Sequence, residues 1–218
     1  MRNGVAYRLG NTLYIGLTNR CNSVTLLGSR GPRFKMNFWK LDEGYEPTAS
    51  DILQEIENQF SIDASSKGSM GEMDGGIVFA GYGEPLLRSE ILFEVVDAFK
   101  SVRNGIPFRI NTNGLILPET VLASSLIHRG DSDSRRDTRI DTISVNIGAQ
   151  NPDIYKKVMQ PQGSLGFRDV CNFISTLSEA GMNVECTVSE NPMVDINATR
   201  ELAFALGART FRTRTYWA

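Results

Sequence analysis

A short apolar run that ends in a glycine-rich loop occupies residues 76–85, which read Gly-Ile-Val-Phe-Ala-Gly-Tyr-Gly-Glu-Pro. The first five residues are typical of a buried β-strand, because they are apolar, rich in β-branched and aromatic types, and bounded by glycine. The following stretch, Leu86–Val102, repeats apolar residues at helical spacing and predicts an α-helix. This part of the chain is therefore expected to form one strand–loop–helix unit.

The same order of elements recurs on both sides of this unit. Alternating strands and helices predict an α/β fold around a parallel sheet. The expected core strands cover residues 12–18, 76–80, 107–111, 141–146, 183–189 and 210–214, and Val5–Leu9 adds a hairpin arm. The expected helices cover residues 46–60, 86–102, 118–128, 152–159, 166–180 and 196–206. We expect a single domain, residues 1–218, forming a six-stranded partial (β/α)6 barrel, because six strands are too few for a closed eight-stranded one.

Polar residues and glycines follow each expected core strand. Each cluster taken singly fits a simple turn, since glycine and asparagine are common turn residues. In parallel sheets, however, ligands bind at the carboxyl ends of the strands. Clusters at all of these ends therefore predict a ligand site there. They comprise residues 17–22, 81–85, 111–114, 144–146, 187–190 and 212–214.

Composition and charge restrict the classes of partner. The formal net charge is −2 without a strongly basic block, so nucleic-acid binding has no electrostatic support. No run approaches the ~20 apolar residues of a membrane span, and no membrane partner is expected. Cys21, Cys171 and Cys186 are too scattered for a disulfide framework, which favours a cytoplasmic location. The single histidine, His128, excludes a multi-histidine metal site within one chain.

Four of the strand-end clusters resemble motifs of the radical S-adenosylmethionine (SAM) enzymes. Leu17–Asn22 is similar to the L-T-N-R-C-N entry of their cluster-binding loop, and Tyr82–Pro85 is similar to their G-G-E-P motif. Thr112–Gly114 matches their T-N-G, and Ile143–Asn146 resembles their fourth-strand I-S-x-x. The chain is most similar to the subgroup linked to TatD-type nucleases, and the resemblance extends from about residue 13 to residue 214.

This resemblance implies a partial barrel that binds SAM at its strand ends. In the family, the G-G-E-P loop hydrogen-bonds the methionine amino group of SAM, where a carboxylate can pair with the ammonium. The fourth strand reaches the ribose and carboxylate, and the fifth contacts the adenine. The SAM-binding residues implied for this chain, together with an arginine at the barrel mouth, are Gly81, Tyr82, Gly83, Glu84, Asn113, Ser144, Asn146, Val188 and Arg212.

The sequence departs from the family at the iron–sulfur cluster. The family's C-x3-C-x2-C loop supplies three thiolates to a 4Fe–4S cluster, and SAM binds the remaining iron. Cys21 occupies the first position and is a candidate metal ligand, but Thr25 and Gly28 occupy the other two and supply no thiolate. The replacement loop contains Arg30 and successive backbone N–H groups, which suit either an anion site or a plain surface loop.

Three functions remain open from the sequence. The first is a SAM-binding protein of radical SAM fold that lacks the usual cluster and serves polar SAM chemistry or a binding role. The second is a genuine radical SAM enzyme that holds a 4Fe–4S cluster through Cys21 and non-standard ligands. The third is a non-catalytic scaffold or ligand-binding module. The polar strand ends favour the first. A small anionic or planar ligand suits the expected barrel mouth, formed by Tyr82, Arg212, Arg214, Tyr216 and Trp217.

Overall fold

The computed structural model describes residues 4–35, 40–65, 75–103, 105–125 and 139–218. His128 and the end of the helix expected at 118–128 lie outside these ranges. Within them, no helix has both the length and the apolar character needed to cross a membrane.

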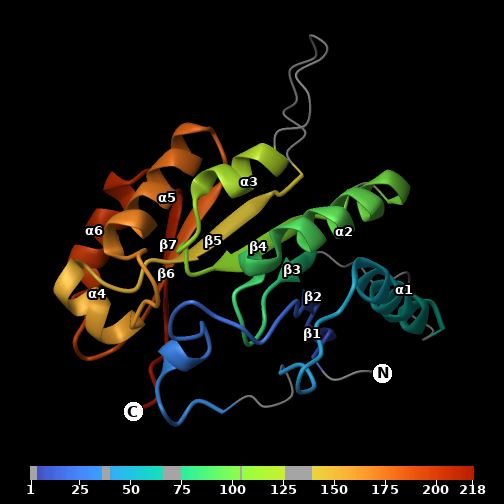
Figure 1. Cartoon of the computed structure of the whole chain (residues 1–218), viewed down its shortest axis with the longest axis horizontal. Helices are drawn as coiled ribbons and strands as arrows, with labels where there is room; N and C mark the ends of the chain where they lie inside the picture. Colours follow the sequence, from blue (N-terminus) through green and yellow to red (C-terminus); the bar gives the residue numbers. More distant parts are fainter. Residues whose placement is uncertain (1–3, 36–39, 66–74, 104, 126–138) are drawn as a thin grey trace.

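A seven-stranded sheet forms the centre of the fold (Figure 1). Its strands lie side by side in chain order, and all neighbours are parallel except the first pair. The expected hairpin arm and core strands are therefore confirmed, with shifted ends. The strands are β1 (Ala6–Leu9), β2 (Thr12–Ile15), β3 (Ile77–Phe79), β4 (Phe108–Thr112), β5 (Thr142–Asn146), β6 (Val184–Ser189) and β7 (Thr210–Arg214).

Helices connect the parallel strands. The α-helices are α1 (Ala49–Ser65), α2 (Ser89–Val102), α3 (Pro118–Ser125), α4 (Pro152–Met159), α5 (Phe167–Glu179) and α6 (Ile196–Ala205), and the 3-10 helices include η1 (Gly28–Arg30) and η3 (Pro85–Arg88). The first two helices have bounds that differ from expectation by more than two residues. The first helix continues to Ser65, and the helix expected from Leu86 begins as η3, because Arg88 leaves helical geometry with φ −128° and ψ 43°.

Alternation along the strands separates two faces of the sheet. In β4, Phe108 and Ile110 are fully buried in the hydrophobic core that the helices cover, and Phe99 of α2 packs edge-on against Phe108. Arg109 and Asn111 point the other way and line a cavity. Apolar burial on the helix side stabilises the fold, while the opposite face is left for polar side chains.

The two edges of the sheet curl toward this one cavity, whose volume is about 540 Å³. Tyr7 and Tyr14 line it from β1 and β2, and Arg212 and Arg214 line it from β7. Strands at opposite edges can share a cavity only if the sheet is rolled, so the partial barrel is confirmed. Figure 1 shows the blue loop that contains η1 beside the red C-terminal tail, and the backbone N–H of Trp217 donates to the Arg30 carbonyl at 2.7 Å.

Candidate functional site

Residues 17–22, here called the Cys21 loop, follow β2 and are held by the glycine-rich loop after β3. The backbone N–H of Gly83 donates to the Thr18 carbonyl at 3.1 Å, and that of Glu84 donates to the Arg20 carbonyl at 2.9 Å. A Cβ at Gly83 would fall on the carbonyl oxygens of Thr18 and Arg20, so only glycine permits this approach. The first two motifs are therefore joined backbone to backbone.

The Glu84 carboxylate connects the same glycine-rich loop to the end of β4. It is wholly buried and accepts hydrogen bonds from the Thr112 hydroxyl and the Asn113 N–H, both at 2.8 Å, and from the Leu86 N–H at 3.1 Å. All three donors are neutral. Burial outweighs them and raises the pKa of Glu84 to about 7. Glu84 therefore anchors the T-N-G turn.

The Asn113 side chain links this turn to the Cys21 loop. Its amide donates to Asn22 Oδ1 at 2.8 Å and lies 3.6 Å from the Cys21 sulfur, and the Asn22 amide donates to the Leu115 carbonyl at 2.7 Å. Burial raises the pKa of the Cys21 thiol, which favours the neutral form. The structure therefore brings Cys21, Glu84 and Asn113 together.

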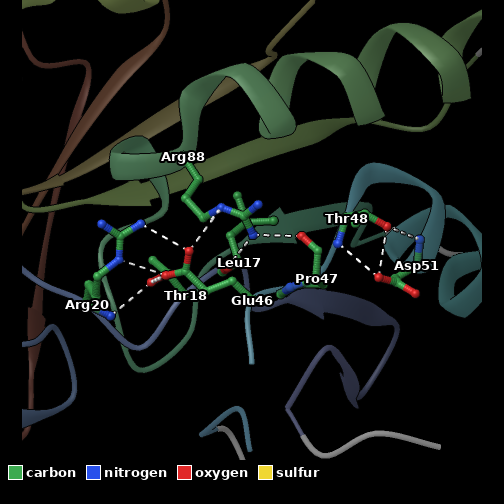
Figure 2. Close-up of polar contacts among 8 residues, drawn as sticks. All are labelled: Leu17, Thr18, Arg20, Glu46, Pro47, Thr48, Asp51 and Arg88. Atoms are coloured by element: carbon green, nitrogen blue, oxygen red, sulfur yellow. Dashed lines mark hydrogen bonds and ion pairs between the residues drawn. The ribbon is translucent and has the colours of Figure 1, made fainter. Parts of the chain in front are cut away.

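A second support for the Cys21 loop was not predicted from the sequence. Figure 2 shows Glu46, just before α1, between Arg20 and Arg88, and its carboxylate accepts from the Thr18 hydroxyl and, at 2.7 Å, from Arg20 Nε. Arg88 lies 3.6 Å from Glu46 and also donates to the carbonyls of Leu17 and Pro47. The pKa of Glu46 is lowered, chiefly by the hydrogen bond from Arg20. The residues involved are far apart in sequence, so no local pattern indicates this network.

Thr25 and Gly28, at the two positions where the family has its second and third cysteines, are hydrogen-bonded to each other within one turn. The Gly28 N–H donates to Thr25 Oγ1 at 2.8 Å, and the Ser29 N–H donates to the Thr25 carbonyl at 2.8 Å. The Ser29 hydroxyl lies 3.3 Å from that of Ser189, at the end of β6. One thiol, an engaged hydroxyl and a glycine do not fit a cluster that needs three thiolates. Nor does any group of three acidic, cysteine or histidine side chains suited to a metal occur within the described ranges.

The other predicted SAM-binding residues are divided between different environments. Ser144 faces the inside of the barrel, is 2% exposed, and its hydroxyl has no hydrogen-bond partner. The Asn146 amide reaches Ser29 Oγ at 3.4 Å, so the replacement loop covers it. Val188 lies in the helix-side core, and its neighbour Thr187 lines the cavity instead.

The remaining predictions concern the glycine-rich loop and the barrel mouth. Gly81 and Arg212 line the cavity. Tyr82 is half-buried outside the set of residues that line it, and its ring lies 5.4 Å from the Lys40 ammonium. Trp217 is 50% exposed. The mouth therefore includes only part of the expected set.

Arginines dominate the polar lining of the cavity, hereafter the arginine cavity. They are Arg30, Arg109, Arg212 and Arg214. The Glu185 carboxylate accepts from Arg109 at 2.6 Å and also from Arg212. Sequence reasoning placed Arg212 and Arg214 at the mouth and Arg30 in a separate loop, and it missed Arg109, which alternation along β4 could have found.

Solved structures share this architecture. TYW1 with a lysine–pyruvate adduct bound aligns with a TM-score of 0.63 at 12% identity, over 95% of this chain and 65% of that one. SuiB from Streptococcus suis bound to S-adenosylmethionine aligns with a TM-score of 0.59 at 14% identity, over 94% of this chain and 38% of that one. The chain has the radical SAM fold. TsrM from Kitasatospora setae, a radical SAM methyltransferase, aligns with a TM-score of 0.52 at 12% identity, over 92% and 35% of the two chains.

The radical SAM fold of this chain spans less than two thirds of the length of each of these structures. No protein-family model and no curated protein matches its sequence. Identities this low show a shared fold and leave the reaction to be argued from the site itself.

Proposed function

We propose that this chain is a SAM-binding protein of radical SAM fold that works without the usual three-thiolate 4Fe–4S cluster, and that it is similar to the TatD-linked subgroup. The observation that carries the proposal is a contrast between two loops. Glu84 and Asn113 keep the strand-end motifs interlocked around the Cys21 loop, whereas Thr25 and Gly28 are closed in a turn of their own. This contrast supports a SAM site that has its polar motif residues but lacks two of the three cysteines that would bind the cluster.

Ser144 supports the SAM part of the proposal. Buried hydroxyl groups are nearly always hydrogen-bonded, and an unpartnered one calls for a bound group. A buried hydroxyl without a partner inside the barrel suits a hydroxyl group of the SAM ribose. Without a cluster, SAM can act there as a polar methyl donor or as a bound regulator, and the scattered cysteines favour a cytoplasmic location.

The test is calorimetric titration with SAM. Wild type is expected to bind, and Ser144→Ala to bind about three- to tenfold more weakly, because one hydrogen bond to the ligand is worth roughly 0.5–1.5 kcal/mol. Ser101→Ala, an exposed serine on α2, is the control and is expected to leave SAM binding unchanged. Absence of SAM binding by wild type would favour the scaffold alternative and end the proposal.

Iron content tests the second part of the proposal, that the chain works without the usual 4Fe–4S cluster. After anaerobic reconstitution, wild type is expected to retain far less than the roughly four irons per chain of a 4Fe–4S cluster. Cys171→Ala serves as the control for Cys21→Ala. A full complement of iron and sulfide that Cys21→Ala abolishes and Cys171→Ala preserves would establish the genuine radical enzyme instead.

A further inference from the structure

The arginine cavity carries more positive charge than its own residues balance. Four guanidinium groups line it, and Glu185 is the carboxylate that pairs with two of them. The Arg214 guanidinium makes no hydrogen bond or ion pair to the described part of the chain. Burial lowers the pKa of Arg214, and the nearby Arg30 and Arg212 lower it further. Burying an unpaired charge is costly, which indicates that a ligand of opposite charge supplies the partner.

SAM does not meet this need. Its sulfonium and ammonium groups outnumber its single carboxylate, so a net positive ligand would add to the excess in the cavity. Asn111 adds an independent indication, because it lines the cavity with a buried, unpartnered oxygen. A buried polar atom without a partner, in the same cavity as the unpaired Arg214 guanidinium, marks a site for a ligand that forms hydrogen bonds.

The lining of the cavity also includes aromatic and apolar side chains. Tyr7 and Tyr14 stack with ring centroids 5.3 Å apart, and Leu26 and Leu27 of the replacement loop belong to the lining as well. A cavity of about 540 Å³ is within the usual range for a small organic ligand. The ligand is therefore expected to have a charged end beside the arginines and a planar or apolar remainder beside the tyrosines.

We propose that the arginine cavity binds a phosphorylated small molecule, with its phosphate beside Arg214 and Arg30 and its organic part against Tyr7 and Tyr14. A phosphate monoester carries between about −1.5 and −2 charge at neutral pH, more than one carboxylate supplies. Its oxygens also match the planar donor fork of a guanidinium. The replacement loop contributes Arg30, Leu26 and Leu27 to this site, which gives that segment a role that does not involve iron.

The experiment is calorimetric titration with phenyl phosphate, inorganic phosphate and citrate, in buffer without SAM. Phenyl phosphate is expected to bind at least tenfold more tightly than inorganic phosphate, because only the ester fills the aromatic part of the cavity. Citrate separates the phosphate class from polycarboxylates, and citrate binding as tight as that of phenyl phosphate would overturn the assignment. Wild type that binds none of the three at millimolar concentration would overturn the site itself.

Arg214→Gln is the informative variant, with Arg168→Gln as its control. Arg168 is exposed on α5, so both changes remove one positive charge and only one removes it from the cavity. Arg214→Gln is expected to weaken phenyl phosphate binding at least tenfold, and also to raise the melting temperature of the unliganded protein, because it removes an unpaired, half-buried charge. Equal weakening by both variants, or a lower melting temperature for Arg214→Gln, would contradict the proposal.

This proposal does not rest on SAM binding. Wild type that binds SAM and not phenyl phosphate would overturn the anion site alone. Wild type that binds phenyl phosphate and not SAM would overturn only the proposed function.

Discussion

Replacing Glu84 by alanine is expected to lower the free energy of unfolding by about 3 kcal/mol, because it leaves three buried hydrogen-bond donors without an acceptor. The carboxylate accepts from Leu86, Thr112 and Asn113 without exposure to solvent. Alanine leaves their N–H and O–H groups unpaired and opens a cavity between the ends of β3 and β4. Urea unfolding followed by circular dichroism measures the loss.

Glu94→Ala is the matched control for this variant. Glu94 lies on the exposed face of α2, and alanine is a better helix former than glutamate, so a change within about 0.5 kcal/mol is expected. Losses of similar size in the two variants would mean that the Glu84 contacts contribute nothing beyond an ordinary surface carboxylate.

The cost of Glu84→Ala is also expected to depend on pH. The pKa of Glu84 is raised in the fold from 4.5 to about 7, so its contribution is complete below pH 4.5 and is lost as the pH rises through 7. The difference in unfolding free energy between wild type and Glu84→Ala should therefore shrink from pH 5 to pH 8. The comparison with the variant is needed because it cancels every pH dependence of stability that the two proteins share. A difference that grows with pH would mean that the three donors, and not burial, set the pKa.

The order of the strands was predictable because each one has a clear local signal. In β4, large apolar residues alternate with Arg109 and Asn111, and that period identifies both the strand and its two faces. The ends were less predictable. β2 ends at Ile15 rather than at Thr18. The Gly16 N–H donates the last hydrogen bond, to the Val5 carbonyl, and the residues after Gly16 form the Cys21 loop instead of continuing the strand. Whether a strand continues past such a point depends on its partner and not on its own residues.

The candidate site was predictable only where a motif already contains the relevant residues. Glu84 and Asn113 belong to motifs, and the structure brings them together at the Cys21 loop. The pairing of Glu46 with Arg20 and Arg88 has no such signal, because it depends on where the chain returns after long connections. Val188 shows a different limit. A shift of one residue along a strand changes the face, and Thr187 faces the cavity where Val188 was expected to contact a ligand.

Gly83→Ala is expected to separate the motifs that the fold joins, at a cost of about 3 kcal/mol in unfolding free energy. The methyl group would fall on the carbonyls of Thr18 and Arg20, which are backbone atoms and cannot rotate away. Either the Cys21 loop or the glycine-rich loop must then move, and both backbone hydrogen bonds between them lengthen or break. The strain arises from crowding alone, because Gly83 is not among the glycines with positive φ.

Gly166→Ala provides the control. A Cβ at Gly166, just before α5, meets nothing within 4 Å, and the backbone there is extended with φ −154°. Alanine at this N-terminal capping position is expected to cost less than about 1 kcal/mol. Urea unfolding distinguishes the two variants, and equal costs would show that the backbone contacts of Gly83 do not position the Cys21 loop. A selective loss in Gly83→Ala together with weaker SAM binding would mean that the approach of these two loops shapes the proposed SAM site.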